Sequence, residues 1–145
     1  MKPGSILLCA LIILLSACDP GVHVGWQTDF EGLVDDRCIE RALRSVSPDV
    51  KRSTYVSDGS RGFPSGTEVT QFYYPDPITH YGYMFDLAHL PNGKTHYIHE
   101  WRKLGNDIPA DEQAQVLPLL FRANAAISRL CGLPFNGSKP EVGPG

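Results

Sequence analysis

The sequence predicts an α+β fold in which a four-stranded antiparallel meander carries an N-terminal and a C-terminal helix on one face. Two segments, residues 33–46 and 109–130, place apolar residues at helical spacing. Between them lie four short segments rich in aromatic and β-branched residues, each bounded by turn-forming residues. Because consecutive strands joined by short turns usually pair, the simplest arrangement is a two-layer sandwich in the order α-β-β-β-β-α.

The first helix is expected over residues 33–46, where apolar side chains recur every three or four positions. Asp35 and Asp36 fall in its first turn and Arg44 in its last, as the helix dipole favours. Pro48 restricts the preceding residue to extended conformations, so the helix must end before it.

The second helix is expected over residues 109–130. Acidic residues again open it, Arg129 lies in its last turn, and Gly132 is placed to form a left-handed C-terminal cap. Pro118 lacks an amide proton, so it should kink the helix or split it into a short turn and a main helix.

Four strands are expected at residues 51–57, 67–74, 79–89 and 95–104. The clearest turn is Leu90-Pro91-Asn92-Gly93, because Pro91 suits the second position of a type I turn and Gly93 can form the left-handed bulge. This turn sets the hairpin register, with Leu87 opposite Tyr97, Phe85 opposite His99, and Tyr83 opposite Trp101. The predicted core face carries Tyr81, Tyr83, Phe85, Leu87, Tyr97, His99 and Trp101. The predicted outer face carries Met84, Asp86, Ala88, His96, Ile98, Glu100 and Arg102.

The first eighteen residues have the pattern of a targeting signal. Met1 and Lys2 precede a ten-residue apolar run at 6–15, which is too short to span a bilayer, and Leu15-Ser16-Ala17-Cys18 follows. This tetrapeptide resembles the lipobox of bacterial lipoproteins. The resemblance implies that residues 1–17 are removed and that Cys18 carries a diacylglycerol and an N-acyl chain. Asp19 resembles an inner-membrane retention signal, so a periplasm-facing protein of the inner membrane is favoured over one of the outer membrane.

Removal of the signal leaves two cysteines in an oxidising compartment, Cys38 and Cys131, because Cys9 is lost and Cys18 is acylated. We expect a disulfide between the two helices; buried free thiols or one reactive thiol are the alternatives. Residues 18–29 are expected to be the lipidated N-terminus and a tether, residues 30–135 the domain, and residues 136–145 a disordered tail.

The charge balance excludes one class of partner. Once Lys2 is lost with the signal, 12 basic side chains remain against 16 acidic ones. Nucleic-acid binding requires a basic face, so we expect no such partner. Apart from the covalent lipid on Cys18, we expect no cofactor.

The sequence contains no strong catalytic or metal-binding signature. His96 and His99 stand three apart in an alternating strand and should therefore face opposite sides, unlike the paired histidines of a zinc helix. Asp86, His96 and Glu100 would provide acid–base chemistry only if they converged in a cleft; a surface ion pair is the simpler interpretation. His99 is expected to be a hydrogen-bonded core residue.

The remaining candidates are contact residues. The glycine-rich segment 59–66 is expected to be a flexible hairpin loop, or a contact loop anchored by Arg61 and Phe63. Tyr55, Tyr73 and Tyr74 cannot all point inward, which predicts a tyrosine-bearing surface that includes Tyr73 and Tyr74. The sequence therefore favours a lipid-anchored, non-catalytic domain that binds another envelope protein, as an assembly or secretion accessory or as an inhibitor or immunity protein. A small-ligand or glycan-binding module is the alternative, and an enzyme is the third.

Overall fold

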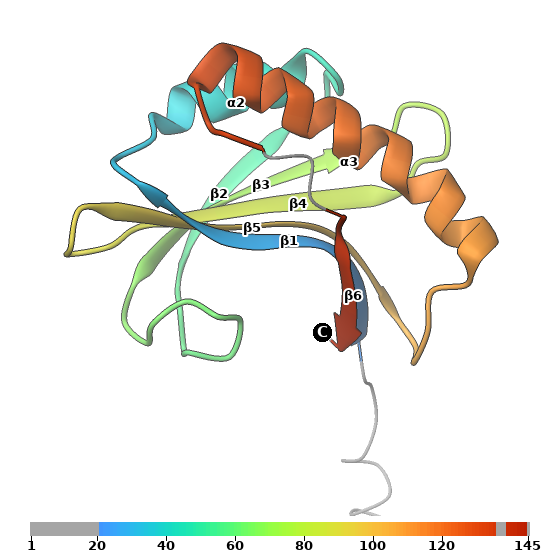
Figure 1. Ribbon diagram of the computed structural model, residues 1–145, viewed down its shortest axis with the longest axis horizontal. Coiled ribbons are helices and arrows are strands. Elements are labelled where there is room, and N and C mark those ends of the chain that lie inside the picture. The colour runs from blue at the N-terminus through green and yellow to red at the C-terminus, as the bar shows by residue number, and fades with distance from the viewer. Residues whose placement is uncertain (1–20, 136–138, 145) are drawn as a thin grey trace, which may run out of the picture.

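A computed structural model describes residues 21–135 and 139–144. They form one six-stranded antiparallel sheet with two helices packed on one of its faces (Figure 1). The strands are β1 (Gly21–Glu31), β2 (Lys51–Val56), β3 (Glu68–Pro75), β4 (Gly82–His89), β5 (Lys94–Leu104) and β6 (Glu141–Pro144). The helices are α2 (Asp36–Arg44) and α3 (Ala110–Cys131). The α+β class and the two helices on one face are confirmed.

The strand number predicted from the sequence is wrong: the sheet has six strands in the order β2-β3-β4-β5-β1-β6. Residues 21–29, expected to be a tether, form most of β1, which pairs with β5 along its whole length. Residues 141–144, expected to lie in a disordered tail, form β6 against β1. The glycines and Pro20 near the N-terminus suggested a linker, but Val22, Val24 and Trp26 alternate with smaller or polar residues, as in a strand. The folded unit therefore extends beyond residues 30–135 at both ends.

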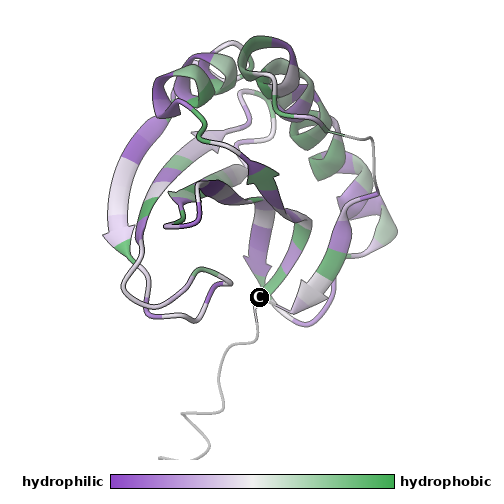
Figure 2. Ribbon diagram, turned by 60° about the vertical axis from the view of Figure 1, so that its left-hand side comes forward, coloured by the Kyte–Doolittle hydropathy of each residue, from purple (hydrophilic) through white to green (hydrophobic). Residues whose placement is uncertain are grey.

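The register predicted for the β4–β5 hairpin is confirmed. Leu87 pairs with Tyr97, and the two other predicted pairs are also present. In the turn, the Leu90 amide donates to the Lys94 carbonyl at 2.8 Å, and Gly93 has a φ of 82°. The predicted core face is buried against the helices apart from the half-buried Tyr81. Figure 2 shows the alternation of hydrophobic and hydrophilic residues along the strands.

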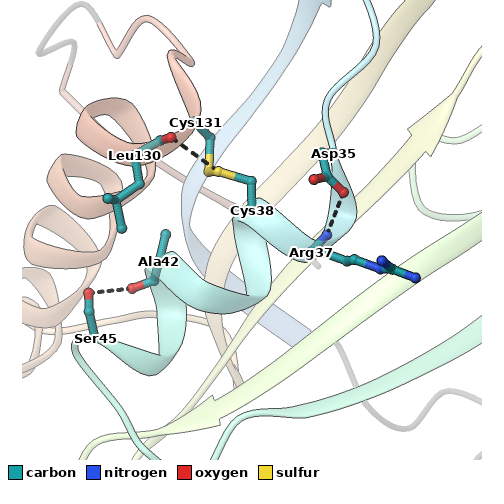
Figure 3. Close-up of a disulfide and its surroundings, with 7 residues drawn as sticks. All are labelled: Asp35, Arg37, Cys38, Ala42, Ser45, Leu130 and Cys131. Atoms are coloured by element: carbon teal, nitrogen blue, oxygen red, sulfur yellow. Dashed lines mark hydrogen bonds between the residues drawn. A yellow bond between two sulfur atoms is a disulfide. The ribbon is translucent and has the colours of Figure 1, made fainter.

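The two helices are joined by the Cys38–Cys131 disulfide, as predicted (Figure 3). The two Cα atoms are 5.7 Å apart, within the usual range for a disulfide. Helix α2 begins one residue after Asp35, whose carboxylate accepts a hydrogen bond from the Arg37 amide at 3.0 Å. The disulfide thus joins the first turn of α2 to the last residue of α3.

Helix α3 is continuous through Pro118, so the alternative of a split helix is wrong. It ends at Gly132, which has a φ of 71° and forms the predicted left-handed cap. Neither helix in the described part of the chain is long and apolar enough to cross a membrane. Residues 1–20, which include Cys18 and the segment expected to be the signal, lie outside the described residues.

Candidate functional site

The most unusual chemistry lies on the sheet face opposite the helices. Asp86 on β4 and Glu100 on β5 are 0% and 2% exposed, although this was the predicted outer face. Arg61 reaches both carboxylates: its Nη1 lies 3.1 Å from Asp86 Oδ2 and its Nη2 lies 2.9 Å from Glu100 Oε1. Arg102 Nη2 reaches the same Glu100 oxygen at 3.0 Å. Because two acids and two arginines are compensated within one cluster, the burial of these charges is sustainable.

The loop between β2 and β3 covers this cluster. In Figure 1 it folds back on the side of the sheet away from the helices. Phe63, at its centre, is 1% exposed and packs with Val69, Ala88 and Ile98 in a second, smaller hydrophobic cluster. The Ser57 hydroxyl donates to the Phe63 carbonyl at 3.0 Å, which holds the loop in a closed turn.

This loop corrects two predictions. It is not a free hairpin loop, because Phe63 and Arg61 anchor it to its own sheet rather than to another molecule. Phe63 is therefore unavailable as a surface contact, whereas the Arg61 side chain keeps 23% of its exposure. The physical reason is that the outer face carries apolar Ala88 and Ile98, which need a cover.

Asp86 is held by more than its ion pair. Its Oδ2 accepts hydrogen bonds from the Tyr55 hydroxyl at 3.0 Å and from the Gln71 amide at 3.3 Å. Burial raises the pKa of Asp86 above its ordinary value, although Arg61 and these two donors oppose the rise. Burial, together with the neighbouring Asp86 charge, raises the pKa of Tyr55 to about 12. Tyr55 is therefore a neutral donor at physiological pH.

A pocket of about 170 Å³ adjoins the cluster, between β1, the β2–β3 loop, β5 and β6. It is lined mainly by charged and polar side chains: His23, Gln27, Ser60, Arg61, Glu100, Arg102 and Glu141. Gly25 forms part of its wall. A Cβ at this position would lie 2.1 Å from the His99 carbonyl oxygen and 2.7 Å from Glu100 Cβ, so only glycine fits.

Asp86, His96 and Glu100 do not converge in a cleft: the two carboxylates bind Arg61, and His96 binds another acid. His96 Nδ1 donates instead to Asp29 Oδ1 at 2.5 Å, and its Nε2 lies 3.2 Å from the Gln27 amide nitrogen. His96 and Asp86 are diagonal neighbours on β5 and β4, but each has a different partner. Among the described residues, no group of three histidine, cysteine or acidic side chains is placed to hold a metal ion.

His99 is a core residue, as predicted, and faces the helices rather than the pocket. It is fully buried; its Nδ1 donates to Asn124 Oδ1 and its Nε2 accepts from the Tyr74 hydroxyl. Burial lowers the pKa of His99 to about 4, and the Asn124 hydrogen bond only partly offsets this effect. A neutral imidazole in this position connects the sheet to α3.

Of the two tyrosines predicted to lie on the surface, Tyr73 is exposed and Tyr74 is buried. Tyr74 is fully buried against Tyr83, with ring centroids 5.3 Å apart, so it is excluded as a contact residue. Tyr73 points the other way and is 40% exposed. It lines an open hollow of about 500 Å³ together with Arg44, Pro48, Asp49, Val50, Lys51 and Pro75. Tyr73 pairs with Lys51 on β2, the strand at the edge of the sheet.

Comparison with known proteins adds no assignment: no family model, curated protein or solved structure matches this chain.

The sequence interpretation missed the pocket because two of its walls belong to β1 and β6. His23 and Glu141 were assigned to a tether and a tail, where no site was sought. The period-two alternation of β1 was the available signal for His23. Four residues of β6 offer too little pattern for Glu141 to be found.

Proposed function

We propose that this protein is a lipid-anchored, periplasm-facing module of the bacterial envelope that acts by binding rather than by catalysis. Cys18 is its acylated residue and Asp19 favours the inner membrane. β1 begins only three residues after Cys18, a span of at most about 10 Å. The anchored domain would therefore stay at the membrane surface, within reach of envelope proteins and not of nucleic acid.

The observation that carries the proposal is the edge formed by β2 and Tyr73. Within the part of the chain that the structure describes, β2 pairs only with β3, and five of its six residues are exposed. An uncovered edge strand offers unpaired backbone donors and acceptors to an incoming strand of another protein. Beside it, Tyr73, Arg44 and Pro75 line the open hollow. Tyrosine and arginine are the residue types that contribute most to protein interfaces.

Crosslinking in the native cell tests this function. The intact lipidated protein is crosslinked, purified and analysed by mass spectrometry, alongside the Tyr73→Ala and Leu104→Ala variants. Leu104 is a matched control because it is 71% exposed and lies at the end of β5, outside the hollow. We expect a stoichiometric envelope protein whose recovery falls with Tyr73→Ala and is unchanged with Leu104→Ala. Recovery unaffected by either change would refute recognition through this edge.

A second function, the binding of a small polar ligand, is favoured by the pocket on the helix-free face. Its lining combines charges of both signs with an amide and a hydroxyl, which is the pattern of a specific polar site. An aromatic platform typical of sugar binding is not part of it. Among the described residues that line it, Trp26 has the one aromatic ring other than the His23 imidazole, and that ring packs edge-on against Phe121 of α3.

A further inference from the structure

The pocket on the helix-free face arranges its charges in two rows across three strands. In one row Glu100 of β5, Gly25 of β1 and Glu141 of β6 are paired neighbours. In the next row on the same face, Arg102 of β5 pairs with His23 of β1. Positions two apart along a strand are separated by about 7 Å. An acidic row and a basic row therefore face the pocket at a spacing that one small molecule can bridge.

The middle of the acidic row is open at Gly25, which contributes no side chain. Glu100 and Glu141 lie on either side of it, one strand away in each direction. Glu100 Oε1 is already shared by Arg61 and Arg102, whereas Glu141 is exposed and has no ion pair with any described residue. The free negative charge of the pocket is therefore that of Glu141.

The basic row has unused donors. Arg102 uses only Nη2 for its ion pair with Glu100, and its Nε is buried without a hydrogen-bond partner. His23 Nδ1 and Arg61 Nε are buried and unpartnered in the same pocket. A buried polar atom without a partner costs about 1–3 kcal/mol, so three such atoms around one pocket indicate a polar ligand, and the two arginine Nε–H groups require acceptors.

We propose that this pocket binds a small zwitterion, with its anionic group on Arg102 and His23 and its ammonium group toward Glu141. This inference deepens the second function proposed above. The arginines of the basic row are already balanced by Asp86 and Glu100, so an anionic group binds there through their unused N–H donors, while an ammonium group pairs with the free carboxylate of Glu141. A zwitterion supplies both groups in one molecule. The pocket volume of about 170 Å³ is that of roughly five or six water molecules. This size suits a free amino acid such as alanine, or the phosphoethanolamine headgroup of a membrane lipid.

Isothermal titration of the full-length protein in detergent micelles tests the proposal with five probes: alanine, phosphoethanolamine, acetate, methylammonium and glucose. We expect one-to-one binding of at least one zwitterion, tenfold or more tighter than acetate or methylammonium. Alanine alone would identify an amino-acid ligand, and phosphoethanolamine alone a lipid headgroup. Binding of neither zwitterion, or equal binding of acetate, methylammonium or glucose, would overturn the proposal.

Variants assign the two ends of the ligand. Arg102→Gln should weaken zwitterion binding at least tenfold, while Arg41→Gln, on the exposed side of α2, should leave it unchanged. Glu141→Gln should reduce the preference for the zwitterion over acetate; this exposed residue can be changed with little risk to folding, which thermal unfolding verifies. Wild-type binding by both pocket variants would place the ligand elsewhere. A Tyr73-dependent crosslink without any zwitterion binding would overturn this ligand and leave protein recognition standing.

Discussion

Replacing His99 by glutamine should remove a specific pH dependence from the stability of the fold. His99 is completely buried between the Tyr74 hydroxyl and the Asn124 amide, and its pKa falls from 6.5 to about 4. Above pH 6.5 the imidazole is neutral in both the folded and the unfolded chain. Between pH 6.5 and 4 the unfolded chain takes up a proton that the folded chain does not, so the free energy of unfolding decreases as pH falls.

The magnitude follows from the shift. The fall of the His99 pKa from 6.5 to about 4 corresponds to about 3 kcal/mol of stability, lost progressively between pH 6.5 and 4. This is a large fraction of the 5–15 kcal/mol that typically stabilises a domain. Glutamine retains donors and an acceptor for Tyr74 and Asn124 but does not titrate, so the variant should lose this part of the pH dependence.

The assay is urea unfolding of the full-length protein in detergent, followed by tryptophan fluorescence at half-unit steps from pH 7 to pH 4. The stability difference between wild type and His99→Gln should shrink by about 3 kcal/mol over this range. The opposite contribution from Asp86, whose pKa is raised, is common to both proteins and cancels. His80→Asn, a change at an exposed histidine, should track the wild type. A constant difference between wild type and His99→Gln would refute the reasoning.

Three further perturbations have expected results that unfolding measurements can check. Cys38→Ser and Cys131→Ser should each destabilise the fold by about 4–5 kcal/mol, because the bond closes 93 residues, and the double variant should be no worse; additive losses would contradict the pairing. Arg61→Met should cost about 3–5 kcal/mol, since it leaves the buried Asp86 without an ion pair and Glu100 with Arg102 alone, and should expose the β2–β3 loop to proteolysis; wild-type resistance to proteolysis would contradict the role of Arg61 in holding the loop. Gly25→Ala should lower the midpoint of thermal unfolding markedly, because its Cβ would collide with the β5 backbone; an unchanged midpoint would contradict that close approach.

The part of the fold that the sequence predicted well is local. The β4–β5 hairpin was placed in its correct register because Pro91 and Gly93 specify the turn and alternation specifies the faces. The two helices were found within a few residues of their ends, because period, capping residues and charges agree. The disulfide followed from counting the cysteines that remain if residues 1–17 are a removed signal and Cys18 is acylated.

The candidate site was not predictable in the same way. Arg61, Asp86 and Glu100 were each noted, but their convergence depends on the loop folding across the sheet. Phe63 and Tyr74 were assigned to the surface because an aromatic residue in a loop or strand carries no local sign of what will cover it. The pocket additionally required β1 and β6, which come from opposite ends of the chain.

By itself, therefore, the sequence determined the fold class, the helices, the central meander, the register of its β4–β5 hairpin and the pairing of the two cysteines. Each of these depends on interactions between residues close in sequence or, for the disulfide, on the number of cysteines available to pair. The tertiary structure alone decided which strands complete the sheet, which face of the hairpin is sealed, and where opposite charges meet. Those outcomes depend on contacts between segments dozens of residues apart, such as Glu141 beside Gly25 and Arg61 beside Glu100. Local sequence patterns do not specify such contacts, because they report only on residues a few positions apart.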